Sequence, residues 1–118
     1  MILEEIRSHC LSLPGVTESI KWEDHLCFCV AEKMFLIVNP DQFPISSSFK
    51  TSVNKFDELI ANEGFIPAPY LARYKWVHVD NIERFSIKEW RDIIDMAYQL
   101  VFDKLPLKKR KELSGEEI

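Results

Sequence analysis

The sequence predicts an α+β fold in which one antiparallel sheet of about five strands carries the N-terminal and C-terminal helices on one face, in the order α-β(4)-α-β-α-α. Three observations predict it: helical periodicity at both ends, short apolar runs between residues 19 and 51, and a capping box before a long C-terminal helix. The chain has 118 residues, 47% of them hydrophobic, which is enough for one core. We therefore expect a single domain over residues 1–118.

The first helix is predicted over residues 2–12. Ile2, Ile6 and Cys10 recur there at helical spacing, which is the pattern of a helix that buries one face. Pro14-Gly15 follows, and this pair favours the end of a helix. The chain is therefore expected to pass from this helix directly into the sheet.

Three short strands are expected between residues 19 and 38, because apolar runs alternate there with turn-forming residues. The apolar runs 26–30 and 34–38 are separated by the turn 31–33, as in an antiparallel meander. The second run is apolar enough for a strand covered on both faces. Residues 45–51 are polar but compatible with β structure, so we expect a fourth strand there.

A helix and a fifth strand are predicted next along the chain. Ser52 is a suitable N-cap for a helix that continues to Glu63, and Gly64 stands where a C′ residue belongs. Alternating side chains over residues 74–79 predict the fifth strand. The helix residues expected to face the core are Val53, Phe56, Leu59 and Ile60.

The C-terminal helices begin with the clearest local signal in the sequence. Ser86-Ile87-Lys88-Glu89 is a capping box, and Phe85 and Trp90 occupy the two positions of a hydrophobic staple. One apolar face continues from there to Val101. Pro106 then marks the start of a short terminal helix, since proline is favoured in the first turn.

Composition limits where the protein acts and what it binds. No apolar run approaches the roughly 20 residues that cross a bilayer, and the N-terminus has no basic flank before an apolar run, as a signal peptide would. Three cysteines are an odd number, which is typical of reduced thiols in a cytoplasm. We therefore expect a cytoplasmic protein with no membrane partner. Its net charge of −4 means that nucleic acid would have to be bound through a local basic patch.

Several catalytic and cofactor-binding motifs are missing from the sequence. Its three glycines cannot form a glycine-rich phosphate loop, and no Gly-x-Ser-x-Gly or His-Glu-x-x-His motif occurs. Cys27 and Cys29 are better explained as small buried residues of a strand than as metal ligands. Neither His9 nor His78 has a nucleophile near it in the sequence. We expect no metal and no cofactor, and catalysis is the least favoured function.

Residues 64–80 hold the densest group of side chains suited to binding. Prolines, large aromatics and cations stand together between a predicted helix end and a predicted strand. Arg73 and Lys75 are expected to be exposed, whereas Trp76 either fills the core or faces a ligand. The part of this stretch that is free to bind extends from Pro67 to Lys75.

The chain resembles the MmcQ/YjbR family of small bacterial proteins over nearly its whole length. The pieces that carry the resemblance are Leu13-Pro14-Gly15-Val16-Thr17-Glu18, Lys33-Met34-Phe35, Phe49-Lys50, Pro69-Tyr70 with Lys75-Trp76-Val77, and Leu105-Pro106. The resemblance implies a frataxin-like (CyaY-like) α+β sheet fold, also called a double-wing DNA-binding motif. A frataxin-like fold suggests iron as well, but Glu4 and Glu5 are too few acidic residues on the first helix for that.

The sequence departs from the family pattern between Tyr70 and Trp76. Many family members carry His-Met-Asn-Lys there, where this chain has Leu71-Ala72-Arg73-Tyr74-Lys75. The histidine and asparagine that would suit acid–base chemistry are therefore absent, which argues against an enzymatic role.

Two binding functions follow from these residues. The first is a non-enzymatic protein that binds DNA, with cations on the phosphates and an aromatic side chain stacked on a base. The residues expected to do so are Lys50, Lys55, Tyr70, Arg73, Lys75, Lys108, Lys109 and Arg110. The alternative is a pocket for a small anionic or aromatic ligand in the same stretch. Its expected lining is Trp22, Tyr70, Arg73 and Trp76.

Overall fold

Six antiparallel strands form one sheet in the computed structural model, which describes residues 2–22 and 24–115. Their order across the sheet is β1-β2-β3-β4-β6-β5, so every neighbour except the β4–β6 pair follows directly in the chain. The strands are β1 (Val16–Lys21), β2 (His25–Val30), β3 (Lys33–Asn39), β4 (Ser46–Lys50), β5 (Phe65–Pro67) and β6 (Trp76–Val79).

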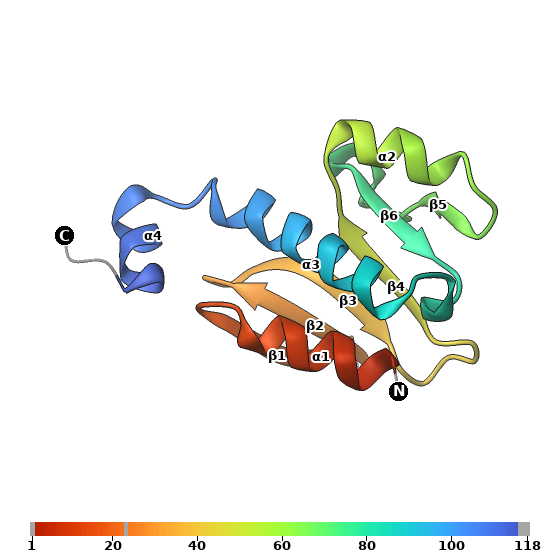
Figure 1. Cartoon of the computed structure of the whole chain (residues 1–118), viewed down its shortest axis with the longest axis horizontal. Coiled ribbons are helices and arrows are strands. Elements are labelled where there is room, and N and C mark those ends of the chain that lie inside the picture. Colours follow the sequence, from red (N-terminus) through yellow and green to blue (C-terminus); the bar gives the residue numbers. More distant parts are fainter. Residues whose placement is uncertain (1, 23, 116–118) are drawn as a thin grey trace.

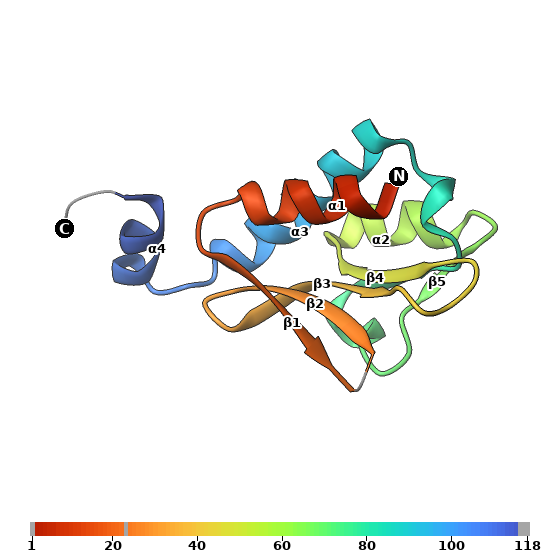
Figure 2. The ribbon, with the colours of Figure 1, turned by 90° about the horizontal axis from the view of Figure 1, so that it is seen from below.

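Three helices cover one face of this sheet (Figures 1 and 2). These are α1 (Ile2–Ser12), α2 (Val53–Ile60) and α3 (Ile87–Phe102), and a further helix, α4 (Leu107–Ser114), follows α3 in the chain. Helix α4 lies beyond the end of α3 and extends the molecule along its longest axis (Figure 1). The predicted α+β fold, with helices packed on one face of an antiparallel sheet, is therefore confirmed.

The sheet has one strand more than the sequence indicated, because residues after α2 pair with β6. β5 has only three residues, too few for an alternating pattern to be visible in the sequence. Helix α2 ends at Ile60 rather than Glu63, so the prediction that Gly64 is its C′ residue was wrong. Gly64 instead precedes β5 at φ +91°, beside the Arg84 side chain. Glycine is favoured at this turn because side chains with a Cβ rarely adopt that backbone conformation.

Local signals at the helix starts are confirmed. Ser86 accepts from the Glu89 amide, while the Glu89 carboxylate accepts from the Ser86 amide, which completes the capping box of α3. The Phe85 and Trp90 rings meet edge to face with centroids 5.1 Å apart, as expected for the staple. Val53 is an exception to the predicted core face of α2, because as the first helical residue it remains 57% exposed.

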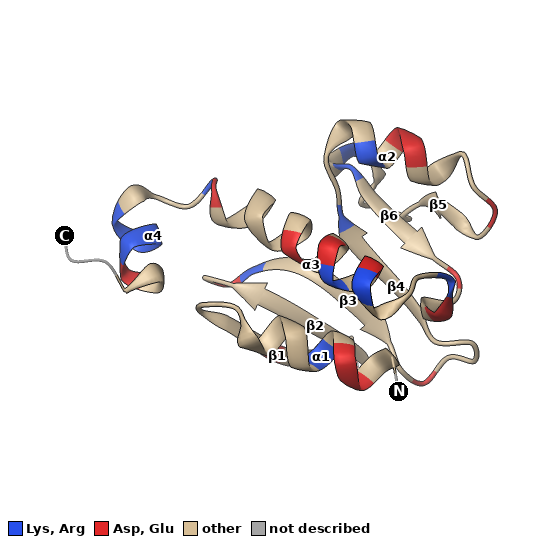
Figure 3. Cartoon of the chain, viewed as in Figure 1, with Lys and Arg blue, Asp and Glu red and all other residues tan. Residues whose placement is uncertain are grey.

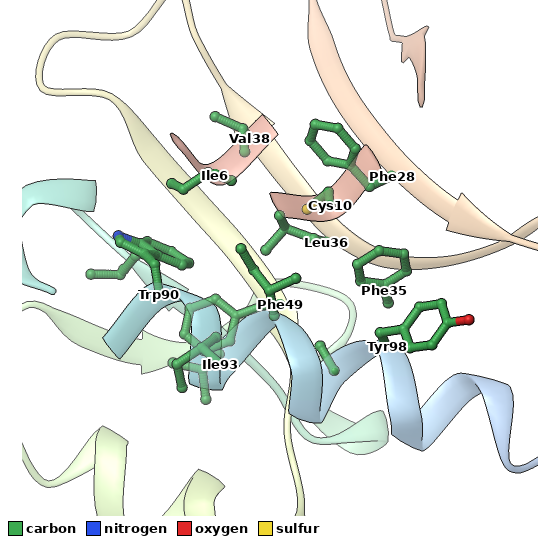
Figure 4. Packing of buried hydrophobic residues seen from close by; sticks show 14 of the residues in the cluster. Ile6, Cys10, Phe28, Phe35, Leu36, Val38, Phe49, Trp90, Ile93 and Tyr98 are labelled. Atoms are coloured by element: carbon green, nitrogen blue, oxygen red, sulfur yellow. The ribbon is translucent and has the colours of Figure 1, made fainter. Parts of the chain in front are cut away.

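The main core lies between the sheet and the three helices (Figure 4). One cross-strand row of the sheet, formed by Phe28, Leu36, Phe49 and Val77, has no solvent exposure. Trp90 of α3 packs its ring edge to face against Phe49 and donates from Nε1 to the Ile82 carbonyl oxygen at 2.7 Å. This core fixes the positions of the strands, and with them the positions of the side chains on the opposite face of the sheet.

The opposite face of the sheet carries a second, smaller cluster. Cys27, Ile37, Ala68 and Trp76 are buried there together. Trp76 is only 5% exposed, which decides between the two alternatives that the sequence left open. It belongs to a core, but to the small core on the face without helices. None of the helices in the described part of the chain is long and apolar enough to cross a membrane.

Candidate functional site

A loop between β5 and β6, residues 68–74, covers part of the sheet face opposite the helices (Figure 2). The loop is tied down by backbone hydrogen bonds. The Ala68 amide donates to the Trp76 carbonyl oxygen at 2.9 Å, and the Leu71 amide donates to that of Ala68 at 3.1 Å. Ala72–Tyr74 then form a single 3-10 turn. Bonds of this kind hold the exposed side chains of the loop in fixed positions.

A hollow of about 410 Å³, here called the aromatic hollow, lies between this loop and the β1–β2 turn. Its lining residues are Trp22, His25, Met34, Ile37, Asn39, Ser48, Pro69, Tyr70, Leu71 and His78. Two large aromatic side chains on its rim are open to solvent, since Trp22 is 61% exposed and Tyr70 is 98% exposed. Exposed rings beside a concave surface are suited to stacking on a flat molecule.

Both rim aromatics have an unusual backbone. Trp22 has φ +50° and Tyr70 has φ +67°, in the left-handed region that side chains with a Cβ rarely adopt. Such a conformation costs on the order of 1–2 kcal/mol per residue. The Trp22 ring packs edge to face against His25 with centroids 5.6 Å apart, whereas the Tyr70 ring is almost fully exposed. Ala31 and Glu32 of the β2–β3 turn and Lys75 share this backbone conformation, so it becomes a pointer to binding only together with the exposed rings and the hollow.

The polar wall of the aromatic hollow comes from three neighbouring strands. Ser48 of β4 and His78 of β6 are register partners, with Ser48 Oγ and His78 Nδ1 2.8 Å apart. Burial lowers the pKa of His78, although Asp80 partly opposes this, so the imidazole is neutral at pH 7. Asn39 of β3 donates from Nδ2 to Ser46 Oγ at 2.9 Å. Its buried Oδ1 has no hydrogen-bond partner among the described residues.

Sequence reasoning missed the Ser48–His78 pair. The two residues are 30 positions apart in the chain, and only the pairing of β4 with β6 makes them neighbours. The alternation predicted for residues 74–79 placed His78 on a strand, but it gave no partner strand. The one signal in the sequence was that both predicted strands carry polar side chains, Ser48 in the serine-rich strand and His78 in the strand after the loop.

A second hollow of about 500 Å³, here called the lysine hollow, lies at the end of the sheet near the C-terminus of α3. Its lining residues are Lys21, Glu32, Lys33, Met34, Lys50, Tyr74, Trp76, Val101, Lys104 and Leu105. Lys50 donates from Nζ to the Tyr74 carbonyl oxygen at 3.2 Å. Burial and the neighbouring Lys104 charge together lower the pKa of Lys50. Several cations therefore converge on a partly apolar surface.

The predicted ligand pocket is assembled only in part. Trp22 and Tyr70 line the aromatic hollow together, whereas Trp76 lies on the wall of the lysine hollow. Arg73 lines neither hollow, and its guanidinium instead lies 5.1 Å from the centre of the Tyr74 ring. Met34 is shared by both hollows, so they adjoin on this face.

The predicted DNA-binding cations are dispersed over the molecule. Lys55 forms an ion pair with Glu58 at 3.1 Å, and the Lys75 ammonium lies 4.8 Å from the centre of the Phe56 ring. Lys108, Lys109 and Arg110 are on α4, at the far end of the molecule from α2 (Figure 3). The structure therefore does not gather these residues with Tyr70 and Arg73 into one patch.

Potential metal ligands are dispersed in the described part of the chain. No three His, Cys, Asp or Glu side chains come together as ligands within residues 2–22 and 24–115. Cys27 and Cys29 are buried, and burial raises the pKa of both thiols. They are thus packed as small apolar residues, away from the conditions that produce a reactive thiolate.

Comparison with known proteins identifies the family. The chain is similar over 98% of its length to a crystal structure of the Deinococcus radiodurans protein DR2400, a DUF419 domain, with a TM-score of 0.83 and 26% sequence identity. The match covers 88% of that protein. A search of curated proteins gave no match. The family model named YjbR matches residues 11–100, and the chain therefore belongs to the YjbR family.

Proposed function

We propose that the protein binds a small planar ligand in the aromatic hollow. The observation that carries this proposal is the pair of exposed rings, Trp22 and Tyr70, at the rim of a hollow of about 410 Å³. Cavities from roughly 300 Å³ upwards are large enough for a small molecule. Both rings are largely exposed, and an aromatic stacking contact with a flat ligand contributes roughly 1–3 kcal/mol.

The polar wall limits the chemistry of the ligand. The buried Asn39 Oδ1 lacks a donor among the described residues, so a ligand N–H or O–H directed at it would satisfy an otherwise costly group. Neutral His78 offers its second ring nitrogen, since only Nδ1 is engaged within the described part of the chain. The favoured ligand is accordingly an uncharged aromatic ring or heterocycle that carries at least one hydrogen-bond donor.

A matched pair of probes tests this proposal. Benzamide has an N–H donor and methyl benzoate lacks one, while the two share the same ring. Titration calorimetry is expected to show tighter binding of benzamide, because only its amide satisfies Asn39 Oδ1. Trp22→Ala and Tyr70→Ala are expected to weaken binding about tenfold each.

The control is Tyr74→Ala, which removes an exposed ring from the same loop but outside the aromatic hollow. Its affinity for benzamide should match that of the unmodified protein. Equal binding by the Trp22, Tyr70 and Tyr74 variants, or no binding by the unmodified protein, contradicts the proposal.

Nucleic acid is the second candidate, favoured by one observation. Tyr70 and Arg73 are both exposed on the 68–74 loop, where a base and a phosphate could be held together. Support is weaker than for a small ligand, because Lys55, Lys75 and the α4 cations lie elsewhere or have other contacts. Binding of a single-stranded oligonucleotide should weaken steeply with added salt and in Arg73→Ala. Affinity that is independent of salt rules this candidate out.

A further inference from the structure

We infer that the lysine hollow is a site for a phosphoryl or diphosphoryl group of a small molecule. Its four lysines come from separate parts of the fold: β1, β3, β4 and the segment after α3. They are Lys21, Lys33, Lys50 and Lys104. Because the sheet and α3 are fixed by the main core, this convergence is a property of the tertiary structure and not of a charge run in the sequence. The site is independent of the aromatic hollow.

The positive charge of the lysine hollow has no carboxylate partner within the described part of the chain. None of its four lysines lies within 4.0 Å of a carboxylate in residues 2–22 and 24–115. Five of the other eleven lysines and arginines do form ion pairs, among them Arg7 with Glu18, Arg84 with Asp80, and Arg91 with Glu5. Among the described residues that line the hollow, four are lysines and one, Glu32, carries a carboxylate. A multiply charged oxyanion would restore the balance.

Lys50 is the best-positioned of these cations. Its Nζ donates one hydrogen bond to the Tyr74 carbonyl oxygen, which fixes the ammonium at the hollow and leaves two donors for a ligand. The positive charge of the neighbouring Lys104 repels the Lys50 ammonium, and an anion bound between the two would offset this repulsion. Phosphate oxygens are suited to such a pair, because charge-assisted hydrogen bonds from ammonium groups are stronger than neutral ones.

The floor of the hollow favours a compact ligand over a long polymer. Trp76, Val101 and Leu105 supply apolar walls beside the cations, and the whole hollow encloses about 500 Å³. Proteins that bind single-stranded nucleic acid generally extend their cations along a groove. Here the further basic run is on α4, where Lys109 is 3.8 Å from Glu112 and thus partly neutralised.

The test is titration calorimetry of the full chain with inorganic pyrophosphate, in the absence of divalent metal. We expect saturable binding that Lys50→Met and Lys104→Gln each weaken about tenfold, the typical effect of losing one charge-assisted contact. Lys104 is exposed, so its variant is expected to fold normally. Lys109→Gln is the control, because it removes the same charge from α4 outside the hollow. Its affinity should stay within about twofold of the original.

Further arms separate the possible sources of the phosphate. If adenosine diphosphate binds with the same affinity as pyrophosphate, the site recognises the phosphate groups alone. If adenosine diphosphate binds more tightly, the ligand is a phosphate attached to a ring. Tyr70→Ala should leave pyrophosphate binding unchanged, so this site survives if the aromatic hollow proves empty. The inference is overturned if pyrophosphate does not bind, or if Lys50→Met, Lys104→Gln and Lys109→Gln all lose the same affinity for it. It is also overturned if an oligonucleotide binds more tightly than pyrophosphate and adenosine diphosphate, with an affinity that falls steeply as salt is added.

Discussion

The two faces of the sheet differ in what covers them. The face under α1, α2 and α3 is closed by apolar side chains, and its row Phe28, Leu36, Phe49, Val77 has no solvent exposure. Within the described residues the other face is covered by the 68–74 loop and has four buried residues in its cluster, with the aromatic hollow beside them and the lysine hollow at the end of the sheet.

This difference separates stability from binding within one sheet. Apolar burial contributes roughly 25 cal/mol per Å², so the helix-covered face supplies most of the folding free energy. The loop-covered face contributes less and instead presents the two exposed rings and the polar wall of the aromatic hollow. Substitutions on the two faces should therefore have opposite consequences for stability and for ligand affinity.

The largest effect is expected from Trp90→Ala on the helix-covered face. Trp90 is 1% exposed, packs against Phe49 and Phe85, and donates a hydrogen bond to Ile82. Its loss leaves both a cavity and an unpaired carbonyl, and should lower the free energy of unfolding by about 5 kcal/mol. Urea denaturation of Trp90→Ala and Tyr70→Ala measures the contrast, with Tyr70→Ala expected within about 0.5 kcal/mol of the original. Similar losses in both variants would show that the faces are not distinct.

A smaller loss is expected from Trp76→Ala, which tests the loop-covered face. Trp76 is as well buried as many core residues, but its cluster is small and adjoins the lysine hollow. We expect a destabilisation of about 3 kcal/mol, at the lower end for a tryptophan, because neighbouring side chains and water can enter the space. Hydrogen exchange should accelerate selectively in residues 68–75, whose backbone bonds depend on this ring's position. Faster exchange in α3 instead would contradict the separation of the two cores.

Tyr70→Gly should have the opposite sign. Glycine adopts φ +67° without the clash of a Cβ, so relief of strain is expected to raise the free energy of unfolding by up to about 1 kcal/mol. The variant should at the same time lose affinity for benzamide. Tyr70→Ala is the control, since it removes the ring but keeps the strained backbone. If Tyr70→Gly is not more stable than Tyr70→Ala, the strain at this position has been overestimated.

The smallest effect concerns the protonation of His78. Burial lowers the pKa of His78 below its ordinary value of 6.5, so the folded state binds fewer protons than the unfolded state. This contribution to stability is complete above pH 6.5 and declines as the pH falls from 6.5 toward the folded pKa. An NMR titration of the ring protons checks the direction, and benzamide affinity should fall over the same range. A pKa above 6.5 contradicts the burial argument.

Features encoded locally were predictable from the sequence, and the fold followed from them. The capping box at Ser86, the strand at 34–38 and the short terminal helix each depend on neighbouring residues. β5 was missed because three residues give no periodicity. Trp76 could not be assigned, since alternation places a side chain on one face of a strand without showing what covers that face.

The candidate site was predictable only where it lies within one segment. The 67–75 stretch was identified from its composition, and Tyr70 does lie at the rim of a hollow. The Ser48–His78 pair and the four lysines depend instead on strand order and on the end of α3, which no spacing in the chain reveals. Conversely, the basic run at 108–111 was conspicuous in the sequence but lies apart from the loop (Figure 3).

The cross-strand row Cys27, Ile37, Ser48, His78 has a consequence for how this protein can change. Each strand contributes one residue to the row, and the next residue on the same strand faces the helices. Mutation of the half-buried Ser48 and His78 can therefore alter the shape and polarity of the binding surface, while Cys27 and Ile37 of the same row stay buried in the small core. A sheet organised in this way can acquire new ligand specificities by single substitutions at the two half-buried positions, without changing the face under the helices.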